Sequence, residues 1–177
     1  MSLQYNVATL LKEPIGSTRE YAVESRVLID EEAPRHYDVS GRTTFLRTRH
    51  GVLVTAHLHG VQREPCSRCL REVDVPVQVE LEEEFFASVD IHTGAHLPPP
   101  EDIEAFRINP QQILDLEEAV RQLWMTALPM QPLCRRDCRG LCPRCGKDLN
   151  EGTCSCPSEA DERWGALRQL LVQMEGK

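Results

Sequence analysis

The alternation that decides the fold class lies at residues 73–82, which read VDVPVQVELE. Apolar residues alternate strictly with polar ones here, and a β-strand places successive side chains on opposite faces of its sheet. The stretch is therefore predicted to be a half-buried antiparallel strand. Pro76 falls on the polar face and has no N–H to donate to a neighbouring strand, so we expect an edge position.

The residues before this strand also read mainly as strands. The stretches 20–29 and 37–48 are rich in β-prone residues. At 52–59 the pattern places Val52, Val54, Ala56 and Leu58 on one face and Thr55, His57 and His59 on the other. The sequence therefore predicts a β-rich unit over residues 1–87.

Residues 88–110 interrupt the strand pattern. Gly94 and the three consecutive prolines at 98–100 lie in an otherwise acidic segment. Such a composition is typical of a surface loop or linker. The carboxylates of this segment show no accompanying apolar pattern that would indicate a pocket.

Two helices are predicted in the C-terminal half, at 111–133 and 158–177. Asp115 followed by Glu118 resembles a capping box, and Pro129 and Pro132 are expected to end the first helix. The apolar stripe of the first helix comprises Ile113, Leu116, Val120, Leu123, Trp124 and Ala127; that of the second comprises Trp164, Leu167, Leu170, Leu171 and Met174.

Between these helices lies a cysteine-rich module at 134–157. Six cysteines occur there within 23 residues, namely Cys134, Cys138, Cys142, Cys145, Cys154 and Cys156. Residues 142–146, CPRCG, have the form of a zinc knuckle, because the C-x-x-C spacing lets both sulfurs reach one ion. We expect four of the six to bind zinc, although the spacing does not decide which four. A disulfide framework is the alternative.

A second C-x-x-C, formed by Cys66 and Cys69, precedes the strand at 73–82. These two cysteines are further candidate ligands for zinc, and eight cysteines would suffice for two four-thiolate sites. The alternatives are a turn with free thiols and a redox pair. A redox C-x-x-C usually opens a helix, whereas here a strand follows.

The overall fold class expected is α+β. It comprises an antiparallel β-rich N-terminal half, a loop at 88–110, one central helix, a small cysteine-rich zinc module and a C-terminal helix. The chain of 177 residues is long enough for one core with an appendage.

Charge is unevenly distributed along the chain, whose formal net charge is −8. Residues 80–104 contain eight acidic residues and no lysine or arginine. Residues 131–148 contain five basic residues against two acidic ones, a net of +3. The basic residues, which are candidate RNA contacts, are Arg135, Arg136, Arg139, Arg144 and Lys147. Ordinary solvated surface is the alternative explanation for both runs.

Several functional classes are disfavoured by the sequence. There is no P-loop, no glycine-rich dinucleotide turn and no G-x-S-x-G motif, so an enzyme is not expected. The sequence has no run of 18 apolar residues, the length that a membrane-spanning helix requires. Lys12 and Glu13 interrupt the N-terminal stretch where a signal peptide would need apolar residues. The chain is therefore expected in the cytoplasm, where thiols stay reduced and available to a metal.

Four sequence segments together resemble the YceD family, whose members are described as large-ribosomal-subunit rRNA accumulation proteins. They are LLKEPIGSTREY at 10–21, PCSRCLREVDVPV at 65–77, LDLEEAVRQLWMTALPMQPLC at 114–134 and CRGLCPRCGKDLNEGTCSC at 138–156. The resemblance runs nearly end to end. It implies a role in the synthesis, stability or assembly of the large-subunit rRNA.

We therefore expect a non-enzymatic factor that meets large-subunit rRNA or a basic ribosomal protein and takes no small-molecule substrate. The basic module offers cations to phosphates, and Arg68 and Arg71 flank the first C-x-x-C. The acidic segment at 80–104 suits a basic ribosomal protein. The alternative, from another functional class, is a zinc- or thiol-based redox sensor.

Overall fold

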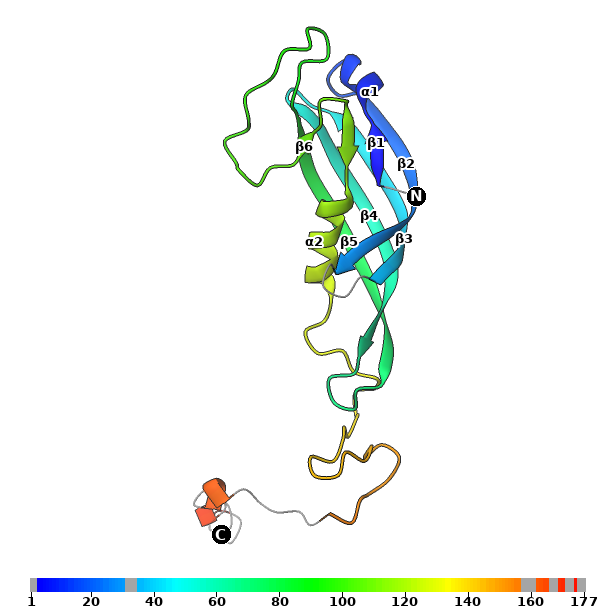
Figure 1. The fold of residues 1–177 in the computed structure, drawn as a ribbon, viewed down its shortest axis with the longest axis vertical. Coiled ribbons are helices and arrows are strands. Elements are labelled where there is room, and N and C mark those ends of the chain that lie inside the picture. Colours follow the sequence, from blue (N-terminus) through cyan, green and yellow to red (C-terminus); the bar gives the residue numbers. More distant parts are fainter. Residues whose placement is uncertain (1–2, 31–34, 157–161, 166–168, 171–173, 175–177) are drawn as a thin grey trace.

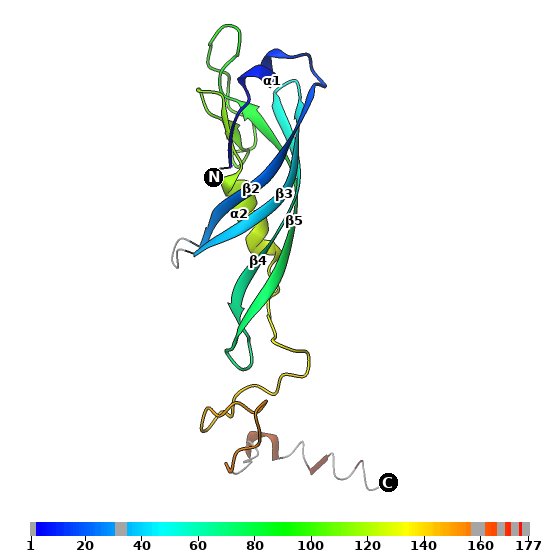
Figure 2. The ribbon, with the colours of Figure 1, turned by 90° about the vertical axis from the view of Figure 1, so that its right-hand side faces the viewer.

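A long twisted sheet forms the body of the protein (Figures 1 and 2). The computed structural model describes residues 3–30, 35–156, 162–165, 169–170 and 174. The sheet has the strand order β2-β3-β4-β5-β6, in which β6 alone runs parallel to its neighbour. Its strands are β2 (Thr18–Asp30), β3 (Arg35–Arg47), β4 (Gly51–Pro65), β5 (Glu72–Ala87) and β6 (Arg107–Ile108).

The remaining elements are short. Strand β1 (Gln4–Asn6) pairs antiparallel with β7 (Ile113–Asp115), and α1 (Ala8–Lys12) follows β1. Helix α2 (Glu117–Ala127) and the 3-10 turn η1 (Glu162–Trp164) lie in the C-terminal half. The mixed α+β, strand-rich class predicted from the sequence is confirmed.

The strand at 73–82 lies within β5 and alternates as predicted. Val75, Val77, Val79 and Leu81 are buried, and the polar residues between them are exposed. Strand β5 pairs with β4 along its length but with β6 only at Phe86 and Ala87. Pro76 therefore has a strand on one side only within the described residues, which agrees with the expected edge position.

Helix α2 covers one face of the sheet (Figures 1 and 2), and its Trp124 side chain belongs to the buried core. Trp124 is fully buried, and its Nε1–H donates to Oε1 of Gln62 on β4 at 2.6 Å. A Cβ atom at Gly60 would lie 2.6 Å from the Trp124 ring. Glycine at position 60 thus lets the ring approach the sheet directly.

The central helix is shorter than the predicted range 111–133. Residues 113–115 form β7 instead, because they pair with β1, and the helix begins at Glu117. The predicted capping box of Asp115 and Glu118 is not formed, because Leu116 is the N-cap residue and Glu118 accepts hydrogen bonds from Arg121 and Gln122 instead. The Asp115 carboxylate does accept the Glu117 N–H at 2.9 Å from the strand that precedes the helix.

The acidic segment at 88–110 is not a linker. Val89 pairs with His96 in a β-bridge, and the Phe86 N–H donates to the Phe106 carbonyl at 2.9 Å. The Phe106 ring stacks on Phe85, with centroids 5.1 Å apart. The segment therefore folds back onto the end of the sheet, where Figure 1 shows it as the green loop beside α1.

The two ends of the sheet carry different structures. The β4–β5 hairpin extends past its neighbours, and the cysteine-rich segment lies against its tip, whereas α1 and the acidic loop occupy the opposite end (Figures 1 and 2). Most of the helix predicted at 158–177 lies outside the described residues. Among the helices that are described, none has the length and apolarity of a membrane span.

Candidate metal centres at the hairpin tip

The turn between β4 and β5 is a knuckle formed by the first C-x-x-C. The Cys66 N–H donates to the Arg71 carbonyl at 2.8 Å, and the Leu70 N–H donates to the Cys66 carbonyl at 2.9 Å. Leu70 has a φ of 60°, a left-handed conformation that residues other than glycine seldom adopt. The turn brings the sulfurs of Cys66 and Cys69 within 4.8 Å of each other.

The second C-x-x-C builds the same turn. The Cys142 N–H donates to the Lys147 carbonyl and the Gly146 N–H to the Cys142 carbonyl, each at 2.9 Å. Gly146 has a φ of 72° and occupies the position that Leu70 occupies in the first knuckle. The chain therefore contains one structural motif twice.

Each knuckle contributes two thiols to a group of four. The hairpin tetrad comprises Cys66, Cys69, Cys134 and Cys138, and the C-terminal tetrad comprises Cys142, Cys145, Cys154 and Cys156. Within each tetrad the four Sγ atoms all lie within 4.8 Å of one another, an arrangement that can hold a metal ion. All eight cysteines are free thiols.

The six C-terminal cysteines predicted as candidate ligands are thus divided between two centres. Cys134 and Cys138 lie with Cys66 and Cys69 across the tip, while the other four lie together. The knuckle residues Cys142 and Cys145 share one tetrad, in line with their common motif. The sequence analysis had left open which cysteines group together, because their spacing does not reveal the approach of 134–138 to the hairpin.

The hairpin tetrad is the more enclosed centre. Cys66, Cys69 and Cys138 are buried, and Sγ of Cys66 lies 3.9 Å from Sγ of Cys138. Sγ of Cys69 lies 3.6 Å from Sγ of Cys134. Both distances connect residues that are far apart in the sequence, so this centre joins the C-terminal segment to the sheet.

Main-chain contacts hold the two segments together beside this tetrad. The Ser67 N–H donates to the Pro132 carbonyl at 2.8 Å, and the Leu141 N–H donates to the Arg68 carbonyl at 3.2 Å. The Arg68 guanidinium donates in turn to the Cys138 carbonyl at 2.8 Å. The hairpin tip and residues 132–141 therefore form one structural unit.

Asn150 is a supporting residue that the sequence analysis did not identify. Its Nδ2 donates to Sγ of Cys138 at 3.4 Å, and its Oδ1 accepts the Arg139 main-chain N–H at 2.9 Å. Nearby, Arg71 pairs with Asp148 at 3.0 Å and with Glu151 at 3.1 Å. These contacts fasten the loop after the second knuckle to the hairpin, and no sequence signal reveals them, because asparagine is common in any loop.

The C-terminal tetrad is local and more open. Its four cysteines come from residues 142–156, and Cys145 is exposed. The Lys147 ammonium donates to the Thr153 carbonyl at 2.8 Å, which closes the loop between the two pairs of ligands. All four ligands of this centre therefore come from one short segment, which the ion pairs of Asp148 and Glu151 with Arg71 attach to the hairpin.

The first cysteine of each knuckle is favoured as a thiolate. Main-chain N–H groups of Cys69 and Arg68 lower the pKa of Cys66 to about 6. Those of Cys145 and Arg144 lower the pKa of Cys142 to about 6. Because a thiolate and not a thiol binds a metal ion, the lowered pKa gives each knuckle one cysteine already in the metal-binding form near neutral pH.

At least one thiol in each tetrad has a raised pKa, which favours its protonated form when no metal is present. Burial, followed by the neighbouring thiols, raises the pKa of Cys134 to about 12. The hydrogen bond with Cys145, followed by burial, raises the pKa of Cys156 to about 12. Four sulfurs this close cannot all be anionic unless a cation lies between them.

The basic residues predicted as RNA contacts lie around these centres. Arg135, Arg136, Arg139, Arg144 and Lys147 are all exposed on the cysteine-rich segment. Arg135 also donates to Asn150 at 2.9 Å and lies 3.4 Å from Asp137. Arg68 and Arg71 add exposed cations from the hairpin.

Comparison with protein families gives one extensive match. The family model described as large ribosomal RNA subunit accumulation protein YceD matches residues 54–171, which include all eight cysteines. No solved structure matches the chain.

Curated relatives come from bacteria and a plant. An uncharacterized protein of Mycobacterium tuberculosis is 37% identical over 121 residues, which cover 68% of this chain and 56% of the relative. One from Mycobacterium leprae is 28% identical over 146 residues, which cover 82% and 63%. The chain thus spans little more than half the length of the mycobacterial relatives it matches.

The plant relative carries a descriptive name. It is the large ribosomal RNA subunit accumulation protein YCED homolog 1, chloroplastic, of Arabidopsis thaliana. It is 32% identical over 65 residues, which cover 36% of this chain and 20% of the relative.

Proposed function

The chain belongs to the YceD family, and we propose on that basis that it supports the accumulation of large-subunit rRNA as a non-enzymatic factor in ribosome assembly. In this proposal the metal-organised hairpin tip is the end that contacts large-subunit rRNA. The proposed location is the cytoplasm.

The observation that carries this proposal is the pair of four-thiol centres surrounded by exposed basic side chains. Zinc fits these centres best, because a tetrahedron with Zn–S bonds of about 2.3 Å has edges of roughly 3.8 Å. The Sγ distances of 3.6 and 3.9 Å in the hairpin tetrad are close to that edge. Zinc would be structural here, since all four positions of each centre are filled by protein sulfurs.

The charge of the metal-loaded tip limits how RNA can be bound. A zinc ion with four thiolates has a net charge of about −2, so two such centres offset several of the surrounding cations. The tip is therefore not a uniformly basic surface. We expect individual exposed arginines, such as Arg136 and Arg139, to contact phosphates, and we do not expect a continuous positively charged surface.

A deletion strain tests the biological role. Cells lacking this protein are expected to contain less large-subunit rRNA relative to small-subunit rRNA. The tagged protein is expected to co-purify with large-subunit components or precursors, and RNase treatment should release them. An unchanged rRNA ratio in the deletion strain would reject the role.

Charge reversal tests the contact. The double variant Arg136→Glu with Arg139→Glu should weaken rRNA binding and reduce the slope of log affinity against log salt by about 0.7 for each lost phosphate contact. The matched control is Lys12→Glu with Arg42→Glu, two exposed cations far from the cysteines. Equal effects of the two doubles would contradict a contact at the tip.

A redox sensor is the second candidate, and the exposure of Cys145 beside the low-pKa Cys142 favours it. With hydrogen peroxide as oxidant, two thiolates would lose two electrons to form one disulfide, peroxide would be reduced to water, and the metal would be released. Titration of thiols under peroxide separates the candidates, because a sensor must form one defined disulfide at low oxidant while a structural centre resists.

A further inference from the structure

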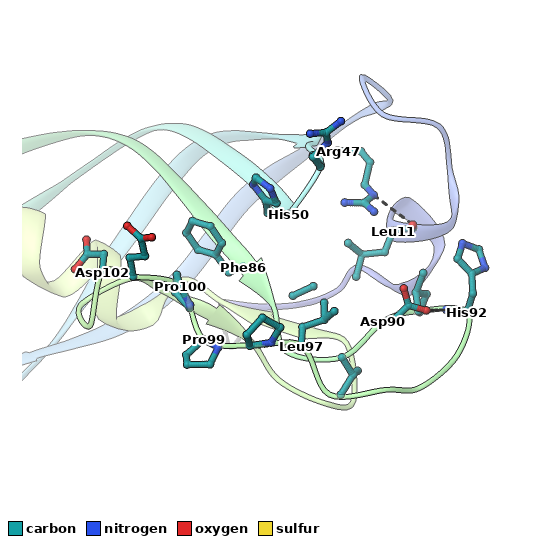
Figure 3. Close-up of a pocket in the computed structure, with 16 residues that line it drawn as sticks. Leu11, Arg47, His50, Phe86, Asp90, His92, Leu97, Pro99, Pro100 and Asp102 are labelled. Carbon is teal, nitrogen blue, oxygen red and sulfur yellow. Dashed lines mark hydrogen bonds between the residues drawn. The ribbon is translucent and has the colours of Figure 1, made fainter.

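The end of the sheet opposite the cysteines contains a cavity of about 750 Å³ (Figure 3). It lies between α1, the β3–β4 turn, the end of β5 and the acidic loop that follows β5. No cysteine lines it, so it is separate from the metal centres. No pocket is predicted from the sequence of the acidic segment, whereas in the structure this segment forms one wall of the cavity.

The interior of the cavity is mainly apolar. Phe86 lies on one side, with the His50 ring stacked near it at a centroid distance of 6.3 Å. Leu97, Pro99 and Pro100 lie across the space in Figure 3, and Leu11 and Pro98 also line the cavity. Such a surface suits one apolar side chain of a ligand.

The acidic loop is held in place by hydrogen bonds of its own. The Leu97 N–H donates to the Ser88 carbonyl at 2.9 Å, and the Asp90 N–H donates to the Ala95 carbonyl at 2.8 Å. The Asp90 carboxylate accepts the main-chain N–H of Thr93 at 2.7 Å. The cavity wall is thus built before any ligand arrives.

The charges around the cavity favour a cationic ligand on the loop side. Glu101 and Asp102 line that wall together with Asp90, whose carboxylate already accepts hydrogen bonds from His92 and Thr93. Residues 80–104 contain no lysine or arginine. Arg49 lines the other wall together with Arg47, whose guanidinium donates to the carbonyls of Leu11, Thr48 and Gly51. Arg47 is thereby committed to the protein's own main chain.

We propose that this cavity binds a basic peptide segment, with one apolar side chain between Phe86 and the proline wall and neighbouring lysines or arginines facing Glu101 and Asp102. The inference rests on the proposed function in one respect: a basic ribosomal protein tail is the expected source of such a segment. Binding at this end leaves the cysteine tip free for RNA.

Fluorescence anisotropy with three labelled seven-residue peptides tests the proposal. The first alternates lysine and arginine around a central leucine, the second replaces that leucine by serine, and the third replaces the basic residues by glutamate. The leucine-containing basic peptide is expected to bind at least about fivefold more tightly than the serine one, because about one leucine side chain is removed from water. No binding is expected for the acidic peptide.

Two double variants locate the site. Glu101→Lys with Asp102→Lys should weaken binding of the leucine peptide about tenfold or more, since two ion pairs become repulsive. The control Glu80→Lys with Glu82→Lys makes the same change of net charge at exposed positions of β5 outside the cavity and should have less than a threefold effect. Leu97→Ser should abolish the preference for leucine over serine, and thermal unfolding verifies that each variant is folded.

Three results would overturn the proposal. They are equal binding of the leucine and serine peptides, equal weakening by the two double variants, and tighter binding of a uridine homopolymer that competes with the peptide. The peptide measurements test whether the cavity binds a basic peptide, whereas the rRNA ratio in the deletion strain tests the proposed function. A failure of one is therefore distinguishable from a failure of the other.

Discussion

Leu70 and Gly146 occupy the same position in two copies of one turn, with φ values of 60° and 72°. A left-handed conformation costs a residue with a Cβ about 1–2 kcal/mol, whereas glycine adopts it freely. The first knuckle therefore stores strain that the second avoids. The Leu70 side chain is 66% exposed and recovers little of that energy by burial.

Exchanging these two residues gives opposite predictions for the two knuckles. Leu70→Gly should stabilise the hairpin tip by about 0.5–1 kcal/mol, because relief of strain exceeds the entropy gained by the unfolded chain. Gly146→Leu should destabilise the second knuckle by about 1–2 kcal/mol, since a Cβ there meets no neighbour and only backbone strain acts.

Competition with a zinc chelator measures both variants. Leu70→Gly should retain its metal at higher chelator concentration than the wild type, and Gly146→Leu should lose one equivalent earlier. A loss of affinity in Leu70→Gly would mean that the leucine side chain contributes contacts within the tip.

At the scale of elements, Trp124 is the largest of the three buried side chains by which α2 packs on the sheet. Trp124 is fully buried, and its Nε1–H donates to Gln62. The same helix presents Met125 to solvent with 48% of its surface exposed. Substitution of Trp124 therefore tests core packing, whereas substitution of Met125 changes the same helix without removing a buried side chain.

Trp124→Ala should lower the free energy of unfolding by about 3–5 kcal/mol, because a large buried ring is lost and the Gln62 carbonyl loses its donor. Met125→Ala is the control, with an expected change within about 0.5 kcal/mol. Denaturant unfolding followed by circular dichroism measures both. Similar values for the two would mean that α2 is not fixed to the sheet in solution.

The two tetrads of cysteines predict that the protein binds two metal ions. Protein purified under reducing conditions without chelator should contain two equivalents of zinc, and Cys142→Ser should contain one. Elemental analysis checks this stoichiometry. Less than half an equivalent in the wild type would reject zinc at these centres.

At the scale of the whole molecule, the core and the metal centres are separate. Among the residues that the structure describes, the main core cluster contains 23 buried side chains and none of the eight cysteines. The sheet with α2 therefore has its own source of stability, whereas the tip has only a small cluster around Cys66, Cys69 and Cys138 and is expected to depend on metal coordination.

Removal of metal should accordingly unfold the tip and leave the sheet folded. With chelator present, amides at 64–72 and 132–156 should exchange faster, because structural zinc supplies folding free energy locally. Amides at 53–60 and 75–82 should keep their protection, and amide exchange read by mass spectrometry separates the segments. Joint loss of protection in both sets would show that the fold requires the metal.

Some of this organisation follows from sequence because it is local. The alternation at 73–82 reflects the two-residue period of a strand, and the C-x-x-C spacing reflects the reach of two sulfurs within one turn. Both depend on neighbours a few residues away. The predicted strands and the zinc-type motifs could therefore be recognised without a structure.

The boundary of α2 could not be recognised in this way. Residues 113–115 fit the helical stripe in sequence, but their pairing with β1 outweighs that local preference. The apolar cavity was missed for the same kind of reason. The acidic loop follows β5 closely in sequence, but it encloses a space because Phe106 stacks on Phe85 and the loop forms hydrogen bonds back to the end of β5 and within itself.

The sequence by itself determined that this protein has a β-rich body, an excess of acidic residues and enough thiols for two metal ions. Only the tertiary structure decided which thiols share a centre. Cys69 and Cys134 are 65 positions apart, and their approach depends on the long hairpin and on the path of the chain beyond α2. The spacing of cysteines in the sequence shows only which sulfurs can meet within one turn. The approach of two distant cysteines depends instead on how the whole chain packs.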